Sequence, residues 1–200
     1  ERRQGRVITR AAYESMGGIA GAIASRAEDL YTSIDAAGQD AVRRLLLRLV
    51  VPGDGAEDTR RRVRYSDLPP GTAVVVEALE THRLLVADRD PSTREPTVEV
   101  AHEALLRSWP RLRGWLAEDR DFLRRLQHVG TAAEAWAAAG RPDSELYRGA
   151  RLDGASDALQ TRPDQFNDLE RDFVEASRAA SWAAAERDQR ARRRLGRALV

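Results

Sequence analysis

Apolar residues recur at helical spacing in the first fifty residues of the chain. Within residues 9–34, the apolar positions on one helical face are Ile19, Ala20, Ile23, Ala27, Leu30 and Tyr31. Charged residues stand between them, so the segment is predicted to be a helix with its lead-in and to bury one face. A second helix is predicted over residues 39–51, which Pro52 and Gly53 would end. Its apolar stripe consists of Val42, Leu45, Leu46 and Leu49.

The pattern changes after the second helix. Residues 54–58 read as an acidic loop, and residues 60–65 suit a short extended segment. Residues 72–81 favour a third helix, although a run of three valines lowers its helix propensity. Two short strand-like runs follow at 83–88 and 97–101. The segment that joins them is rich in Asp, Pro, Ser and Thr, so it predicts a β-hairpin.

These elements follow one another in the order of a winged helix, which is a variant of the helix-turn-helix. The winged-helix domain is placed at residues 37–107. From His102 onward the pattern is helical again, and Pro110 is expected to bend or restart the helix after Trp109. The sequence therefore predicts a mainly α fold, in which a winged-helix domain with a small β-hairpin wing is followed by an all-α helical arm.

The helical arm is expected to contain several separate helices. The predicted helical stretches after the Trp109 break are 122–139, 144–150 and 168–194, with a polar loop over 161–167. No internal repeat of solenoid length is present. The arm is therefore interpreted as a helical connection to other parts of a larger protein.

Composition excludes several classes of enzyme. The sequence contains neither cysteine nor lysine. Without cysteine there are no disulfides, thiolate zinc sites or thiol nucleophiles. Without lysine there is neither a phosphate loop of the Walker type nor Schiff-base chemistry. With 42% hydrophobic residues and a net charge of +1, the chain should fold and has no overall bias toward nucleic acid.

The remaining motifs do not complete a catalytic or metal site. His102 and Glu103 begin like a zinc protease motif, but Leu106 stands where the second histidine is required. His82 and His128 have no short metal-binding spacing to another ligand, and no Gly-x-Ser-x-Gly motif is present. We therefore expect this chain to be no enzyme and to bind no metal.

Two arginine-rich segments, 60–64 and 187–197, are candidates for contact with phosphates. The helix predicted over 72–81 would enter a DNA groove, yet it carries Glu77 and Glu80 and no basic residue. DNA binding is therefore disfavoured, and contact with protein or nucleotide is preferred. The second segment fits either a solvated helix end or a basic collar beside a membrane.

One longer segment resembles a known family. Residues 98–112, with the sequence VEVAHEALLRSWPRL, resemble the region that follows the ATPase core in bacterial STAND-class P-loop NTPases. These proteins are multidomain signalling switches. The segments 43–50, 57–63 and 146–152 agree with the same family, and the resemblance runs from about residue 5 to 177.

The resemblance implies a domain arrangement and a nucleotide contact. Residues 1–36 would end a helical lid domain, 37–107 would form the winged helix, and 108–200 would form a helical arm with a basic tail. In the family a winged-helix histidine reaches the bound ADP, and His102 occupies that place. Glu103 stands where the family has Asp, and it is expected to orient the imidazole or cap the next helix. A purely structural role for His102, as a helix cap, remains the alternative.

The resulting hypothesis is a non-catalytic regulatory segment of a STAND-class signalling NTPase. It would help to hold ADP, or ATP, bound by a P-loop domain outside this chain, whose full-length protein would be an ATPase. Its partners would be that upstream domain and a downstream sensor in the same polypeptide. The alternatives are a winged-helix DNA-binding regulator and a helical scaffold for a protein partner. A cytoplasmic location is expected, and a membrane contact would come only through a segment after the tail.

Overall fold

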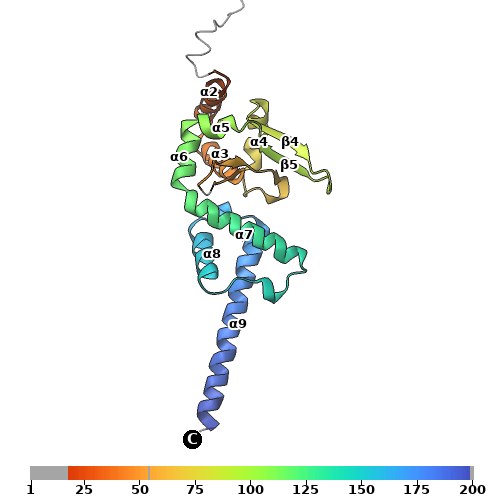
Figure 1. Cartoon of the computed structure of the whole chain (residues 1–200), viewed down its shortest axis with the longest axis vertical. Helices are drawn as coiled ribbons and strands as arrows, with labels where there is room; N and C mark the ends of the chain where they lie inside the picture. Colours follow the sequence, from red (N-terminus) through yellow and green to blue (C-terminus); the bar gives the residue numbers. More distant parts are fainter. Residues whose placement is uncertain (1–17, 54, 199–200) are drawn as a thin grey trace, which may run out of the picture. The chain divides into compact units, whose positions relative to one another are not determined.

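The computed structural model describes residues 18–53 and 55–198, and it is mainly helical with small antiparallel sheets (Figure 1). This confirms the predicted fold class. The chain divides into two compact units, which meet in sequence between Arg120 and Asp121, and each is described by itself. The predicted domain bounds 1–36, 37–107 and 108–200 are a different, finer division, and they stay a prediction.

The first unit combines helices with short strands. Its helices are α2 (Gly18–Ser33), α3 (Ala36–Arg48), α4 (Ala73–Thr81), α5 (Ala104–Ser108), α6 (Pro110–Glu118) and the 3-10 turn η1 (Tyr65–Asp67). Its strands are β1 (Val50–Val51), β2 (Thr59–Arg60), β3 (Val63–Arg64), β4 (Leu85–Arg89) and β5 (Pro96–Val100). Strands β1 and β2 form one antiparallel pair, and the other sheet has the order β3-β5-β4.

Helix α3 begins and ends earlier than the predicted range 39–51. The Asp35 carboxylate accepts a hydrogen bond from the Gly38 N–H at 2.9 Å, so Asp35 caps a helix that starts at Ala36. Val50 and Val51 leave the helix and pair with β2, because β-branched residues fit a strand well. The predicted stripe of Val42, Leu45, Leu46 and Leu49 is buried as expected.

Helix α4 and the hairpin confirm the sequence prediction for residues 72–101. Strand β4 pairs antiparallel with β5 from Leu85 opposite Val100 to Arg89 opposite Pro96 (Figure 1). Helix α3 packs against α4, α6 and α2, and α2 also packs against α5. The core of the unit contains the fully buried side chains of Leu45, Leu49, Val98, Val100 and Leu112.

The predicted buried face of α2 is wrong at its first residue. Ile19 is 69% exposed, whereas the buried residues of α2 begin at Ala24 and continue with Ala27 and Leu30. The first turn therefore lies outside the part of the helix that packs on its neighbours. The lead-in predicted over residues 9–17 lies outside the described residues.

The second unit is helical. It is built from α7 (Arg120–Ala138), η2 (Asp143–Glu145), α8 (Gly149–Thr161), η3 (Pro163–Gln165) and α9 (Asp168–Ala198). The core includes Trp136, Phe166 and Phe173, and the Trp136 and Phe173 rings meet edge-on at 5.6 Å. The predicted helix over 144–150 is wrong, because only η2 and the first turn of α8 are helical there. Helix α8 was not predicted as a helix over its length.

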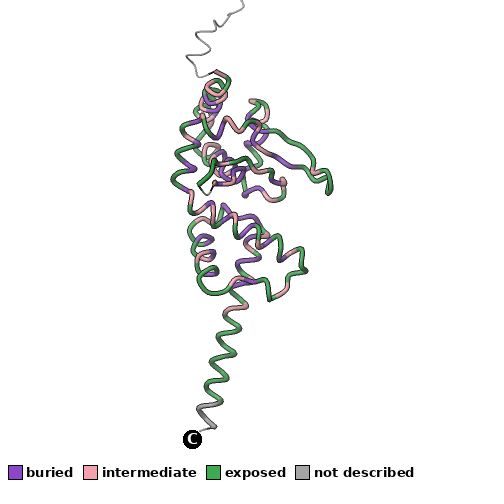
Figure 2. Tube along the Cα trace, viewed as in Figure 1, coloured by how far each residue is buried: buried purple, intermediate pink, exposed green. Residues whose placement is uncertain are grey.

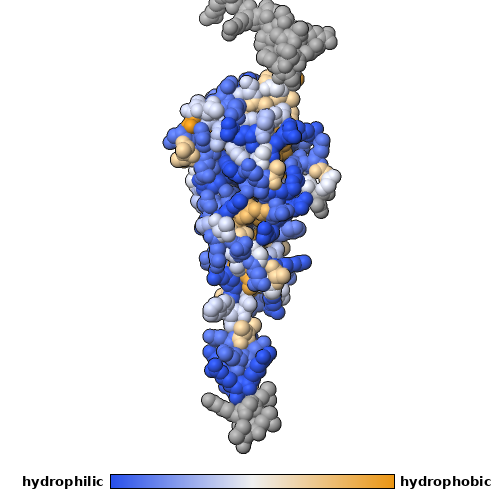
Figure 3. Space-filling view, turned by 90° about the vertical axis from the view of Figure 1, so that its left-hand side faces the viewer, coloured by the Kyte–Doolittle hydropathy of each residue, from blue (hydrophilic) through white to orange (hydrophobic). Residues whose placement is uncertain are grey.

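The last part of α9 is exposed. Every residue from Trp182 to Arg194 is exposed, as the tube in Figure 2 shows for this end of the helix. Among the described residues, no helix has both the length and the apolar character that a membrane crossing needs. On the face drawn in Figure 3, hydrophilic residues predominate and the hydrophobic patches are small and separate.

Candidate functional site

His102 lies where the hairpin passes into helix. Strand β5 ends at Val100, the Ala101 N–H donates to the Leu84 carbonyl at 2.9 Å, and α5 begins at Ala104. The His102 carbonyl accepts from the Leu105 N–H at 2.9 Å, so its backbone is fixed on both sides. Its side chain is exposed, and no described residue is recorded in a hydrogen bond with the ring. Both ring nitrogens are therefore accessible to a ligand.

The predicted partner of His102 lies elsewhere. The Glu103 carboxylate lies 3.6 Å from the Arg107 guanidinium, which also forms an ion pair with Glu57 at 2.9 Å. Glu103 is the N-cap residue of α5, but its side chain accepts no capping hydrogen bond from the described residues. Neither role predicted for Glu103, orienting the imidazole or capping the helix, is therefore seen.

A charged contact joins α2 to the break between α5 and α6. The Glu28 carboxylate accepts from Trp109 Nε1 at 2.8 Å and from Arg111 Nε at 3.0 Å, and its other oxygen accepts from the Arg111 Nη2. The hydrogen bonds from Arg111 lower the pKa of Glu28, with Trp109 adding to them and burial opposing. The two ends of this contact are about eighty residues apart in sequence.

Aromatic rings surround this contact. The Tyr31 ring lies 6.1 Å from the Trp109 ring and 5.4 Å from the Trp115 ring, and the two tryptophans are 5.5 Å apart. The Arg111 guanidinium stacks over Tyr31 at 4.4 Å from the ring centroid. Such contacts favour one fixed arrangement of side chains. Together with Glu28, these four residues form the cluster that we call the α2 latch.

The loop after β1 is bound to Arg120, the last residue of the first unit. The Asp58 carboxylate accepts two hydrogen bonds from Arg120, at 2.9 and 3.0 Å, and one from the Gly53 N–H at 2.8 Å. Arg120 also donates to the Gly53 carbonyl at 3.1 Å. The bond to Asp58 raises the pKa of Arg120. A Cβ atom at Gly53 would lie 2.1 Å from the Ala56 carbonyl oxygen, so the loop requires glycine there.

Three arginines of segment 60–64, namely Arg60, Arg62 and Arg64, form ion pairs with carboxylates. Arg62 lies 3.2 Å from Glu99 and 3.6 Å from Asp88. The hydrogen bond to Glu99 is the main cause of the raised pKa of Arg62. Arg64 donates to Asp67 at 2.8 Å. These local pairs neutralise the positive segment that could have contacted a phosphate backbone.

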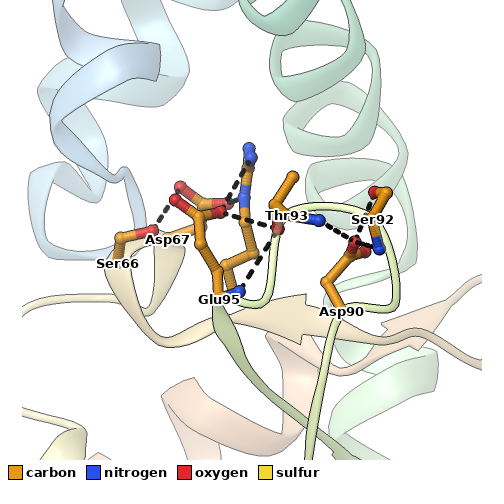
Figure 4. Close-up of polar contacts among 7 residues, drawn as sticks. Ser66, Asp67, Asp90, Ser92, Thr93 and Glu95 are labelled. Atoms are coloured by element: carbon orange, nitrogen blue, oxygen red, sulfur yellow. Dashed lines mark hydrogen bonds and ion pairs between the residues drawn. The ribbon is translucent and has the colours of Figure 1, made fainter.

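The tip of the hairpin is a polar turn, drawn in Figure 4. The Asp90 carboxylate accepts from the Ser92 N–H at 2.8 Å, the Thr93 N–H at 2.9 Å and the Ser92 hydroxyl at 2.5 Å. These hydrogen bonds, with the Ser92 hydroxyl first, lower the pKa of Asp90 to about 2. All three donors bond to the same oxygen, Oδ1 of Asp90, so this side chain closes the turn on itself.

The other two histidines occupy different positions in the fold. His82 ends α4, where its Nδ1 lies 2.8 Å from the Ala78 carbonyl. His128 belongs to the second unit, on α7. Within the described ranges, no group of three or more His, Asp or Glu side chains could hold a metal ion.

Sequence reasoning singled out His102, whose functional role stays a prediction, but it did not indicate the α2 latch or the Asp58–Arg120 contact. Trp109 and Arg111 stood out only as parts of a resemblance, and Glu28 looked like a solvated helix residue. The one available signal was that a tryptophan and an arginine flank a proline, where a buried indole N–H needs an acceptor. Nothing in the sequence named Glu28 as that acceptor.

A family model described as Novel STAND NTPase 1 matches residues 1–144. The match covers most of the chain, including all of the described first unit and all of α7. Searches of curated proteins and of solved structures gave no match.

Proposed function

Because the chain belongs to the Novel STAND NTPase 1 family, we propose that it is a non-catalytic regulatory segment of a STAND-class signalling NTPase. It helps to hold ADP in the inactive state through His102, while the P-loop domain that binds the nucleotide lies upstream in the same polypeptide. Its helical arm connects to a sensor downstream. ADP and ATP are the ligands of the whole protein, and this segment supplies one contact to them.

The observation that carries the proposal is the presentation of His102. Its backbone is fixed by hydrogen bonds at Ala101 and Leu105, yet its ring is exposed and lacks a partner among the described residues. A side chain fixed at its base and free at its tip is suited to reach a group on another domain. An imidazole N–H can donate to a phosphate oxygen, and an imidazolium does so with a charge-assisted bond.

The α2 latch gives the proposal a mechanical basis. If α2 is the end of the lid domain, Glu28 connects that lid to the residues directly after α5. Only α5, five residues long, separates His102 and Glu103 from Trp109. The lid and the histidine would then move together, and nucleotide release would need both to leave.

The sheet order supports the winged-helix interpretation of the domain that carries His102. Helix α3, strand β3, helix α4 and the β4–β5 hairpin follow one another, and β5 lies between β3 and β4. DNA binding by this domain has little support. The exposed face of α4 presents Val74 and Glu77, and the arginines beside the sheet are paired with carboxylates.

The test is the ADP affinity of the full-length protein with His102→Ala. We expect ADP binding to weaken by roughly ten- to a hundredfold, since a hydrogen bond to a charged group contributes about 1.5–3 kcal/mol. Basal signalling activity should rise, because ADP holds the inactive state. The affinity is measured by isothermal titration on nucleotide-free protein.

The matched controls are Glu103→Gln and His82→Ala. Glu103 lies by Arg107, and the ring of His82 bonds within its own helix, so both variants should leave the ADP affinity near the wild-type value. An unchanged affinity in His102→Ala, together with a lower melting temperature, would make His102 a structural residue. The nucleotide role would then be wrong.

A further inference from the structure

The second unit contains a hollow between α7 and α8 that the proposed function does not use. Its volume is about 370 Å³, and Arg125, His128, Tyr147 and Arg151 contribute polar side chains to its wall. Val129 and alanine side chains supply the apolar part of the lining. Pockets for small organic ligands begin at about this size and have this mixture of an apolar surface and few polar groups.

The two charged side chains that line the hollow are arginines, and a histidine lies on the same wall. Arg125 and His128 come from α7, Arg151 comes from α8, and no described carboxylate lines this hollow. A neighbouring, larger hollow shares His128, Tyr147 and Arg151, and the acidic residue on its wall is Glu145.

The two arginines have no ion-pair partner. Among the described residues, neither Arg125 nor Arg151 is recorded in a salt bridge, whereas Arg62, Arg111 and Arg120 are each held by a carboxylate. Because the chain contains no lysine, the choice of arginine here says nothing about its ligand. What points to an anion is that two guanidinium groups and an imidazole line the same hollow, because guanidinium groups bind carboxylate and phosphate oxygens with charge-assisted hydrogen bonds.

The wall that carries these groups is firmly built. The Tyr147 N–H donates to the Ser177 hydroxyl at 3.1 Å, and the Tyr147 hydroxyl donates to the His128 carbonyl at 3.0 Å. The Tyr147 ring meets Phe173 edge-on at 4.9 Å. Tyr147 therefore fixes α7, α9 and the start of α8 around the hollow, as a binding site requires.

The start of α8 adds a further attraction for negative charge. Its N-cap residue, Arg148, forms no side-chain cap with the described residues, and the first turn contains no acidic residue. The positive end of the helix dipole is therefore not offset locally, and Ala150 and Arg151 of that turn line the hollow. This supports the arginines as the main binding groups.

We propose that the hollow between α7 and α8 is a binding site for a small organic anion. The ligand class is a compact apolar body with a phosphate or carboxylate head group, which Arg125 and Arg151 bind while Val129 and Tyr147 contact the body. The site is separate from the nucleotide contact proposed for His102. The segment would thus bind a second ligand, the small organic anion, independently of the nucleotide.

The first test is calorimetric titration of the 200-residue chain with phenyl phosphate, phthalate and neutral benzamide. We expect at least one of the two anions to bind saturably with a dissociation constant at or below about 1 mM. Phenyl phosphate alone would identify a phosphate head group, and phthalate alone a carboxylate. Equal binding of benzamide, or no binding of either anion, overturns the proposal.

The second test uses Arg125→Gln and Arg151→Gln, with Arg178→Gln as the matched control. Arg178 is exposed on α9, has no recorded partner among the described residues and does not line the hollow. Each lining variant should weaken binding about tenfold or more, and the control should leave it unchanged. An equal loss in all three variants would indicate unspecific charge attraction and would overturn the site.

The third test places the ligand directly. The chain has three histidines, so the imidazole NMR signals can be assigned by single substitutions. The anion should shift the His128 signals and leave those of His82 unchanged, and His102→Ala should not alter the affinity. Binding that leaves His128 unshifted, or that His102→Ala abolishes, would place the ligand elsewhere and refute the proposal. Melting curves of each variant check that it is folded.

Discussion

Replacing Glu28 by alanine tests the α2 latch. In the native structure the carboxylate accepts from the indole N–H of Trp109, whose residue is 1% exposed, and from the Arg111 guanidinium. Glu28→Ala removes both acceptors and leaves the helix propensity of α2 intact, because alanine is the best helix former. The variant therefore measures the contacts themselves.

The magnitude follows from how exposed each contact is. The side chains of Glu28 and Arg111 are 39% and 37% exposed, so water screens their ion pair, and it contributes at most about 1 kcal/mol. The buried Trp109 indole is different, because an unsatisfied buried donor costs about 1–3 kcal/mol. We expect Glu28→Ala to lower the free energy of unfolding of the first unit by about 2 kcal/mol. Arg111→Gln should cost about 1 kcal/mol or less.

The assay is hydrogen exchange of peptides from α3, which reports on the first unit separately from the second. Because the pKa of Glu28 is lowered in the folded protein, its charge stabilises the fold at pH values above its ordinary, unfolded pKa of 4.5. That contribution is lost as the pH falls through the folded pKa. The stability difference between wild type and Glu28→Gln should therefore shrink below about pH 4.5.

Two results would refute this reasoning about the latch. If Arg111→Gln destabilises the unit more than Glu28→Ala does, the ion pair and not the indole hydrogen bond is the main contribution. If the difference between wild type and Glu28→Gln is the same at neutral and acidic pH, the charge of Glu28 does not stabilise the fold.

Two further predictions concern the rest of the first unit. Gly53→Ala should destabilise it by about 2 kcal/mol or more, because the new Cβ would collide with the Ala56 carbonyl and displace the Asp58–Arg120 contact. The measurement is thermal melting, and the control is Gly114→Ala, because Gly114 has open space around it. Duplex DNA should bind only weakly and unspecifically, because α4 presents Glu77; a sequence-selective gel shift that survives ~200 mM salt would contradict this.

Periodicity predicted the elements whose faces are strongly apolar or strongly alternating. The stripe of α3 and the two strands of the hairpin belong to this class, and so does the break at Pro110, where the missing N–H starts a new helix. The end of α3 was missed because Val50 and Val51 continue its apolar run. Their strand pairing with residues eight and ten positions further on is a contact that no local pattern contains.

Helix α8 shows the opposite failure. Its sequence is rich in Gly, Ala and Asp, and its buried residues, such as Leu152 and Ala155, are few and small. A weak apolar face gives a weak periodic signal, although the helix packs well against α9. The preceding segment, 144–150, looked helical from its composition, yet Tyr147 there lies outside any helix and its N–H donates to the Ser177 hydroxyl. Tertiary packing decided both cases.

The candidate site illustrates which part of a function a sequence can carry. His102 was predictable because it lies in a recognisable segment at the end of a strand, and its exposed ring needs no distant partner to be described. The latch was not predictable, because the acceptor for Trp109 comes from Glu28, far away in the chain. If the proposed role of His102 is right, the residue that binds nucleotide lies in a local motif that the sequence shows. The residues that connect it to the lid meet only in the folded protein.

The arrangement has a consequence for how nucleotide release would proceed. Leu105 and Leu106 of α5 are buried, so this short helix cannot move without disturbing the core beside α2. Trp109 directly follows it and is held by Glu28. A displacement of α2 must therefore either carry α5 along or break the hydrogen bond to the indole. If α2 belongs to a lid and His102 contacts nucleotide, as proposed, His102 would move with the lid in the first case, and in the second the latch would open before the histidine leaves the nucleotide.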